Sequence, residues 1–197
     1  NVYDIKEDRQ GNMWFGTYGG GLNLKKPGRE MHFESYRAGK TGRYHISSDL
    51  VRTVFIDSRD NIWVGTEDGL NLKRPGADHF EVFRFSPDDP GSISGNVVIS
   101  IFEDSRNRLW LGTYKNGLNQ YHHDTRSFSR FSERNGLPGN NVFGILEDQQ
   151  KLWLSTNNGI CSFDPESGSV RSYNTKDGIG GNEFSIGACY KAGDGQL

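Results

Sequence analysis

The stretch Ile56-Asp57-Ser58-Arg59-Asp60-Asn61-Ile62-Trp63-Val64-Gly65-Thr66 decides the fold, because close copies of it occur at residues 7–17, 103–113 and 147–156. Each copy holds one of the four tryptophans, which are 49, 47 and 43 residues apart. Self-similarity at such a period is typical of propellers and solenoids. The 197-residue chain is therefore predicted to consist of four copies of one structural unit.

Each copy predicts four short strands. An apolar stretch such as residues 51–56 precedes the tryptophan, and a Gly-Leu-Asn phrase and an aromatic stretch follow it. Gly, Asn and Asp clusters interrupt the chain at intervals of about 8 to 12 residues, and no stretch keeps apolar residues at helical spacing for long. Four antiparallel strands in about 45 residues form one blade of a β-propeller. We therefore predict an all-β fold made of β-propeller blades.

A link motif marks the predicted blade boundaries. It begins at Ile46, Ile93, Leu137 and Ile179. The four predicted blades span residues 1–45, 46–92, 93–136 and 137–178. Residues 179–197 are predicted to form the inner strand of a truncated fifth blade. Because closed propellers have about 4 to 8 blades, we expect a fragment of a larger ring.

Composition excludes several classes of function. The net charge is −2, so the basic surface of a nucleic-acid-binding protein is not expected. The apolar runs are too short to cross a bilayer. Two cysteines cannot form a disulfide scaffold, and we expect Cys161 and Cys189 to be packed thiols. No leader pattern follows Asn1, so we expect any targeting segment to lie outside this stretch.

The phrase Asp-x-x-x-Asn-[Ile/Leu/Met]-Trp-x-Gly-Thr, followed by Gly-Leu-Asn, resembles the two-component regulator propeller repeat. The resemblance implies part of a seven-bladed propeller in the periplasmic sensor region of a hybrid two-component histidine kinase. It further implies oligosaccharide sensing, signal transduction, and a dimer in the full-length sensor. The expected partners are an oligosaccharide, the remaining blades and a following β-sandwich domain. The fourth copy departs from the pattern, with Ser155 in place of Gly, Cys161 in place of Asn, and one residue fewer before Trp153.

The mouth of the propeller is the expected ligand site, because the loops entering the inner strands and those joining second to third strands share one face. A sugar would use aromatic faces and polar side chains there. The candidate residues are Tyr18, Asp49, Arg52, Asn96, Tyr114, Lys115, Asn140, Asn141 and Glu183. The alternative is that each is an ordinary turn or solvated loop residue.

Other polar residues are expected to be structural. The aspartates six residues before the first three tryptophans, Asp8, Asp57 and Asp104, and the corresponding Asp148, are predicted to tie their own turns. The residues around Asp57 lack the regular ligand spacing of a calcium-binding loop, so no calcium site is expected there. His122 and His123 are adjacent and would point to opposite faces of a strand. We therefore expect neither a metal nor a cofactor.

Two other classes of function stay open. Propeller enzymes place carboxylates in the channel, but of the inner-strand positions Asp4, Thr53, Ser100 and Gly144 only one is acidic. We therefore expect no catalysis by this stretch. A scaffold for protein–protein interaction, without a small ligand, is the other alternative.

Overall fold

The computed structural model describes residues 1–28, 32–185, 187 and 189. Its strands are β1 (Val2–Glu7), β2 (Met13–Thr17), β3 (Gly21–Lys25), β4 (Glu34–Tyr36), β5 (Val51–Ile56), β6 (Ile62–Thr66), β7 (Gly69–Lys73), β8 (Glu81–Phe83), β9 (Val98–Glu103), β10 (Leu109–Thr113), β11 (Leu118–His122), β12 (Ser127–Phe131), β13 (Val142–Asp148), β14 (Lys151–Thr156), β15 (Gly159–Phe163) and β16 (Val170–Tyr173). Short 3-10 turns lie at η1 (Gly42–Tyr44), η2 (Glu133–Asn135) and η3 (Thr175–Asp177). In these described ranges, no helix is long and apolar enough to cross a membrane.

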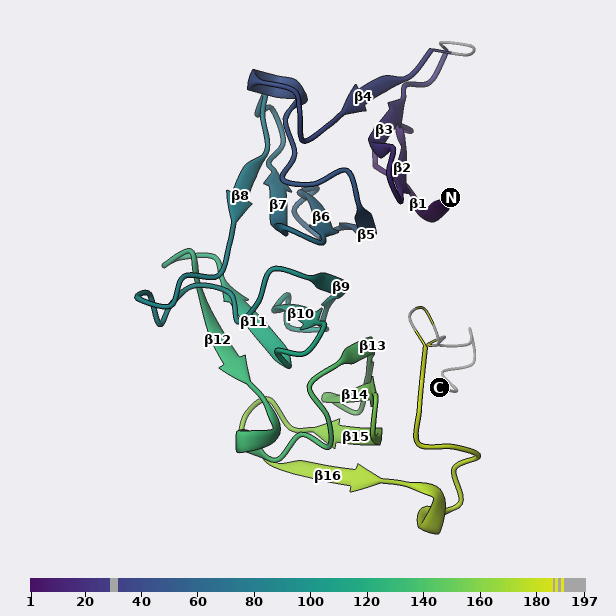
Figure 1. Ribbon diagram of the computed structural model, residues 1–197, viewed down its shortest axis with the longest axis vertical. Helices are drawn as coiled ribbons and strands as arrows, with labels where there is room; N and C mark the ends of the chain where they lie inside the picture. Colours follow the sequence, from purple (N-terminus) through teal and green to yellow (C-terminus); the bar gives the residue numbers. More distant parts are fainter. Residues whose placement is uncertain (29–31, 186, 188, 190–197) are drawn as a thin grey trace. The chain divides into compact units, whose positions relative to one another are not determined.

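The described strands form four four-stranded sheets, each in chain order (Figure 1). We call them blade 1 (β1–β4), blade 2 (β5–β8), blade 3 (β9–β12) and blade 4 (β13–β16). Tight antiparallel hairpins set the register, as where Ile56 pairs with Ile62. The predicted all-β fold of four-stranded blades is confirmed.

The chain divides into two compact units. Unit 1 comprises residues 1–85 with 96–101, and unit 2 comprises residues 86–95 with those from 102 onward. Blades 1 and 2 lie in unit 1, and blade 4 with most of blade 3 lies in unit 2.

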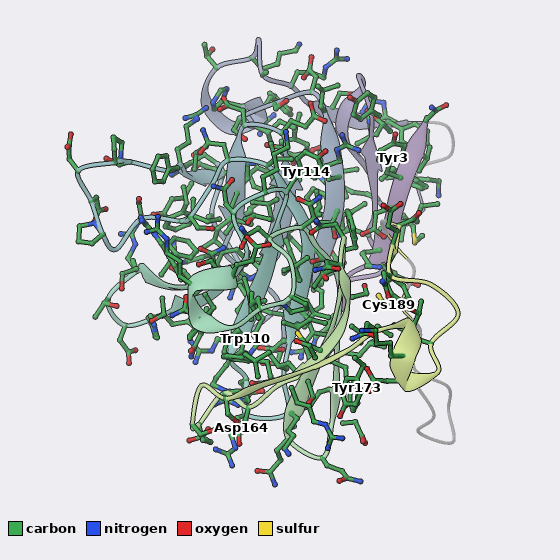
Figure 2. All side chains as sticks on the ribbon, turned by 60° about the horizontal axis from the view of Figure 1, so that its bottom comes forward. Tyr3, Trp110, Tyr114, Asp164, Tyr173 and Cys189 are labelled. Atoms are coloured by element: carbon green, nitrogen blue, oxygen red, sulfur yellow. The ribbon has the colours of Figure 1, made fainter. Side chains whose placement is uncertain are left out.

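The tryptophans pack successive blades together within each unit. Trp14 of blade 1 meets Phe80 of blade 2 edge-on, with ring centroids 6.4 Å apart. In unit 2, Trp110 of blade 3 meets Phe163 of blade 4 in the same way at 5.7 Å. Trp110 is fully buried, and Figure 2 shows it among the strands. Such edge-to-face pairs add stability beyond the area they bury.

A buried aspartate explains why the tryptophan phrase has its fixed spacing. Asp57 Oδ1 accepts the backbone N–H groups of Arg59 (3.0 Å) and Asn61 (2.8 Å). Its Oδ2 accepts the Asn61 side-chain amide and the Trp63 indole N–H, both at 2.8 Å. Equivalent indole bonds join Asp8 to Trp14 and Asp104 to Trp110. The predicted turn-tying role is confirmed for Asp8, Asp57 and Asp104, and the same carboxylates also orient the tryptophans.

The Gly-Thr and Leu-Asn parts of the repeat hold the link that enters the same blade. In blade 2, Asn71 Oδ1 accepts the Ser47 backbone N–H at 2.8 Å, and its amide donates to Ser47 Oγ at 2.8 Å. Ser47 Oγ also lies 2.9 Å from Thr66 Oγ1. Asn71 and Thr66 are fully buried, so this network satisfies polar groups that water cannot reach. Blade 3 repeats the network with Ser94, Thr113 and Asn119.

The fourth copy changes both partners of this network. Pro138 stands at the link position that Ser47 occupies in blade 2, and proline offers neither an N–H nor a hydroxyl. Cys161 takes the place of Asn71 and is fully buried. An asparagine there would lack its partner, so the apolar thiol suits the proline link.

The serine in the fourth copy is matched by a glycine across the strand pair. In blade 2, Thr53 pairs with Gly65, and a Cβ on Gly65 would lie 2.7 Å from Thr53 Cγ2. In blade 4, Gly144 pairs with Ser155, and a Cβ on Gly144 would lie 2.9 Å from Ser155 Oγ. At this pair only one of the two residues carries a side chain. It is Thr53 on the inner strand in blade 2 and Ser155 on the second strand in blade 4.

The residue lost before Trp153 shortens the first hairpin of blade 4. Gln149 and Gln150 both have positive φ, 48° and 63°, and connect the paired residues Asp148 and Lys151. Two such residues form the tight turn that suits a two-residue hairpin. Asp148 is partly exposed, and among the described residues no hydrogen bond runs from the Trp153 indole N–H to its carboxylate. Of the four aspartates, Asp148 therefore does not orient its tryptophan.

The end of the chain adds one further link to blade 4. The Asn182 carbonyl accepts the Gly159 N–H, and Asn182 Oδ1 accepts the Thr175 N–H at 3.0 Å. Residues 179–185 carry no strand. The remainder of the inner strand predicted for 179–197 falls largely on residues 186, 188 and 190–197, which lie outside the described residues.

Candidate functional site

Four side chains from both blades of unit 1 gather where the inner strands begin. Tyr3 of β1 stacks on Tyr18, which follows β2, with ring centroids 5.2 Å apart and an interplanar angle of 26°. The guanidinium carbon of Arg52 lies 4.8 Å from the Tyr18 ring centroid and 5.6 Å from that of Tyr3. Glu67, after β6, pairs with Arg52 and accepts the Tyr18 hydroxyl at 3.3 Å. We call these four residues the tyrosine cluster.

The tyrosine cluster combines an exposed aromatic surface with charged groups. Tyr3 is 45% exposed and Tyr18 is 38% exposed. The stacked rings and the ion pair hold one another in place, so little side-chain entropy remains to be lost on binding. Arg52 Nε is buried and has no hydrogen-bond partner among the residues that the structure describes. Such a surface suits a ligand with an apolar face and polar edges.

A second group of candidates lies in unit 2. Tyr114 is 41% exposed, and Lys115 Nζ lies 5.2 Å from its ring centroid (Figure 2). The Lys115 N–H donates to Asn141 Oδ1 at 2.7 Å, and the Asn141 N–H donates to Asn157 Oδ1 at 3.0 Å. The first bond joins the loop after β10 to the loop before β13, and the second joins the loop before β13 to the loop after β14. The structure therefore brings Tyr114, Lys115 and Asn141 together.

Asp49, Asn96 and Asn140 share one position in the link and one set of contacts. Their backbone carbonyls accept the N–H groups of Gly21, Gly69 and Gly117 at 3.0, 2.7 and 2.8 Å. Their side-chain oxygens accept the backbone N–H groups of Ala38, Phe85 and Glu133 at 2.9, 2.7 and 3.0 Å. These side chains therefore hold the links in place, a role that sequence reasoning did not assign to them.

Asp49 has one contact in addition to this link pattern, and Glu183 lies outside it. Asp49 also forms an ion pair with Arg37 at 2.9 Å, and the Arg37 hydrogen bond holds the pKa of Asp49 below its usual range. Glu183 is exposed and lies in the segment without strand that follows η3.

Sequence reasoning missed Tyr3 and did not commit to Glu67. It assigned its candidates to the mouth loops, although Arg52 lies on strand β5, and it did not consider Tyr3 on strand β1. The exposed side chains of Val2 and Ile5 on the same strand show that β1 is only partly covered. A signal was available, since an aromatic residue at the start of an inner strand lies next to the mouth loops.

Other chemistry is limited in the described residues. Asp4, the one acidic inner-strand candidate, accepts the Val54 N–H at 2.9 Å and so joins blades 1 and 2. No cluster of three or more His, Cys, Asp or Glu residues with metal-site geometry occurs in the part of the chain that the structure describes. Cys161 is buried as predicted, whereas the prediction for Cys189 is wrong because this thiol is exposed.

Comparisons with known proteins agree with the repeat. The family model described as two component regulator propeller matches residues 1–19, 45–68, 92–115 and 136–158. Histidine kinase P4 of Formosa agariphila is 31% identical over 187 residues, which are 94% of this chain and 14% of that protein. The chain thus spans about a seventh of that relative.

Solved structures with the same fold include extracellular domains of two component systems and enzymes. A structure described as the extracellular domain of hybrid two component system BT3049 from B. thetaiotaomicron aligns with TM-score 0.83 at 24% identity, covering 98% of this chain and 26% of that one. The corresponding domain of BT4673 from the same organism gives TM-score 0.77 at 25% identity, covering 91% and 26%. A virginiamycin B lyase and a GH74 enzyme share the fold as well, so the fold alone leaves catalysis open.

The three buried Asp–Trp hairpins, the link network and the four family-model matches have one common explanation. The chain belongs to the two-component regulator propeller family.

Proposed function

We propose that this stretch is part of the extracellular, periplasmic sensor propeller of a hybrid two-component histidine kinase, and that it takes part in sensing an oligosaccharide. The family repeats and the histidine kinase relative support a sensor role. The BT4673 domain, which is described as extracellular, supports the location.

The tyrosine cluster carries the carbohydrate part of the proposal. A sugar ring is apolar on one face and has hydroxyl groups around its edge. Tyr3 and Tyr18 offer partly exposed rings, while Arg52 and Glu67 offer a donor and an acceptor beside them. In unit 2, Tyr114 and Lys115 present the same pairing of an aromatic ring with a cation.

Binding without catalysis is the role we favour. The Asp4 carboxylate is occupied by the Val54 N–H, so it is poorly placed to act as an acid or base. The remaining blades, a β-sandwich domain and a second sensor copy are the proposed partners. A scaffold for protein–protein contacts is the alternative, and it predicts no response to sugars.

The test is calorimetric titration of the complete sensor region with a panel of oligosaccharides. We expect an oligosaccharide to bind either at the tyrosine cluster of unit 1 or at the Tyr114 group of unit 2. The corresponding variant, Tyr18→Ala or Tyr114→Ala, should weaken that binding by about 1 kcal/mol, as the loss of an aromatic contact does. Phe85→Ala is the matched control, because Phe85 is 42% exposed but lies after the outer strand β8. Absence of binding to every sugar, or an affinity unchanged from the original protein in both tyrosine variants, would reject the proposal.

A further inference from the structure

A cavity of about 370 Å³ lies between blades 1 and 2, on the side of their first hairpins. Blade 1 contributes Lys26 and Tyr36 to its wall, and blade 2 contributes Lys73 and the turn at residues 74–78. Arg43, from η1, also lines it. None of the mouth candidates does. We call this space the interblade cavity, and its volume is in the range of small-molecule sites.

In unit 2, side chains fill the corresponding space between blades 3 and 4. Arg106 and Arg108, on the first hairpin of blade 3, both reach Glu166 of blade 4 at 2.6 Å. The corresponding residues of blade 1 are the shorter Gln10 and Asn12. Ion pairs therefore cross the space in unit 2, whereas the cavity occupies it in unit 1.

The cations that line the interblade cavity are not all neutralised. Lys26 pairs with Glu34 at 2.6 Å, and Arg74 pairs with Glu81 at 2.7 Å. The Lys73 ammonium donates to the Ala77 carbonyl, and Arg43 donates to the Tyr44 hydroxyl. Within residues 1–28 and 32–185, no ion pair joins Lys73 or Arg43 to a carboxylate. Burial lowers the pKa of Lys73, an effect that nearby Asp78 partly offsets and Lys26 reinforces.

The carboxylates in the wall already have donors. Asp8 accepts two backbone N–H groups, an amide and an indole. Asp60 Oδ2 accepts the Gln10 amide at 2.6 Å, whereas Asp60 Oδ1 is buried and has no hydrogen-bond partner among the described residues. Asp78 lies 2.6 Å from the His79 ring nitrogen. An incoming molecule therefore meets two cations without a carboxylate partner among the described residues, while Asp8, Asp60 and Asp78 each already have a polar contact.

We propose that the interblade cavity binds a small molecule through a carboxylate that accepts hydrogen bonds from Lys73 and Arg43. Charge-assisted bonds of this kind are about twice as strong as neutral ones. A partly buried ammonium without a carboxylate also gains most from an arriving anion. This site is separate from the tyrosine cluster and does not depend on the function proposed for it.

The experiment titrates the 197-residue chain with D-glucuronate, L-glutamate and D-glucose, followed by calorimetry. We expect at least one carboxylate to bind and glucose not to bind. Glucuronate and glutamate distinguish a sugar acid from an amino acid as the source of the carboxylate. Failure of both carboxylates to bind, or equal binding of glucose, would overturn the proposal.

Four variants locate the site, with circular dichroism confirming that each is folded. Lys73→Met should weaken carboxylate binding about tenfold, the effect of losing one charged hydrogen bond. Lys73→Arg should retain most of the affinity, and Lys40→Met, which removes an exposed lysine elsewhere in unit 1, should change nothing. Tyr18→Ala should leave this binding intact, which separates it from the mouth. Unchanged affinity in Lys73→Met would overturn the assignment.

Discussion

In the first hairpin of each of blades 1 to 3, one buried carboxylate accepts hydrogen bonds from several groups of its own hairpin. Asp57 is 3% exposed and accepts four hydrogen bonds from its own hairpin and from Trp63. A buried charge is stable only when such donors surround it. The repeat therefore keeps aspartate and tryptophan six residues apart, because that spacing brings the indole N–H onto Oδ2.

Replacing Asp57 by Ala should destabilise the chain by about 3 kcal/mol, because the Trp63 indole and two backbone N–H groups lose their acceptor in a buried site. Urea denaturation followed by circular dichroism measures the change. Asp148→Ala is the matched control at the same repeat position, and its cost should stay within about 0.5 kcal/mol because it does not hold Trp153. Similar costs for both variants would contradict the assigned role of Asp57.

Asp49 should make a small contribution to acid sensitivity. Arg37 holds the pKa of Asp49 below its usual value of about 3.9. A lowered pKa in the folded chain gives stability that is present above pH 4 and is lost as the pH falls through the lowered pKa. Both side chains are about a third exposed, so this contribution stays below about 1 kcal/mol.

Asp49→Asn tests this contribution. Asparagine can still accept the Ala38 N–H, as Asn96 accepts that of Phe85, but it cannot titrate. Thermal melting at pH 6 and pH 3 should therefore show a smaller difference in midpoint for the variant than for the original chain. An equal or larger difference would show that Asp49 does not contribute.

At the scale of the blade, paired substitutions keep the fourth copy compatible with the fold. In blade 2, Asn71 accepts a hydrogen bond from the Ser47 backbone N–H. In the fourth copy, Pro138 lacks this N–H and Cys161 lacks the amide oxygen that would accept from it. Gly144 and Ser155 pair across β13 and β14, whereas in blade 2 the glycine and the residue with a side chain are on the opposite strands. Each departure from the repeat thus has a partner in space, which neither position reveals by itself.

A double-mutant cycle tests the first pair. Cys161→Asn should cost about 2 kcal/mol, because a buried amide faces a proline without an N–H. Adding Pro138→Ser should recover part of this cost by restoring the Ser–Asn network of blade 2. Denaturation of the two single variants and the double variant gives the coupling energy. Strictly additive effects would contradict the pairing.

At the scale of the whole chain, the two thiols should report separately on folding. Burial raises the pKa of Cys161 to about 12, while Cys189 is exposed. Because the thiolate is the reactive form, a disulfide reagent at pH 8 should modify one thiol rapidly and the second only when the chain unfolds. In Cys189→Ser the rapid phase should disappear. Two rapid phases would show that blade 4 opens readily in solution.

The sequence by itself determined the all-β blades, because turn residues, strand alternation and the Asp–Trp spacing act within a few residues of one another. It also pointed to Tyr18, Arg52 and Tyr114 as mouth residues. Only the tertiary structure decided that Tyr3 stacks on Tyr18 and that Asp49, Asn96 and Asn140 tie the links. The interblade cavity likewise depends on side chains from blades about 50 residues apart in the chain. Such contacts join distant residues, so no local pattern predicts which polar groups they occupy and which remain free to bind.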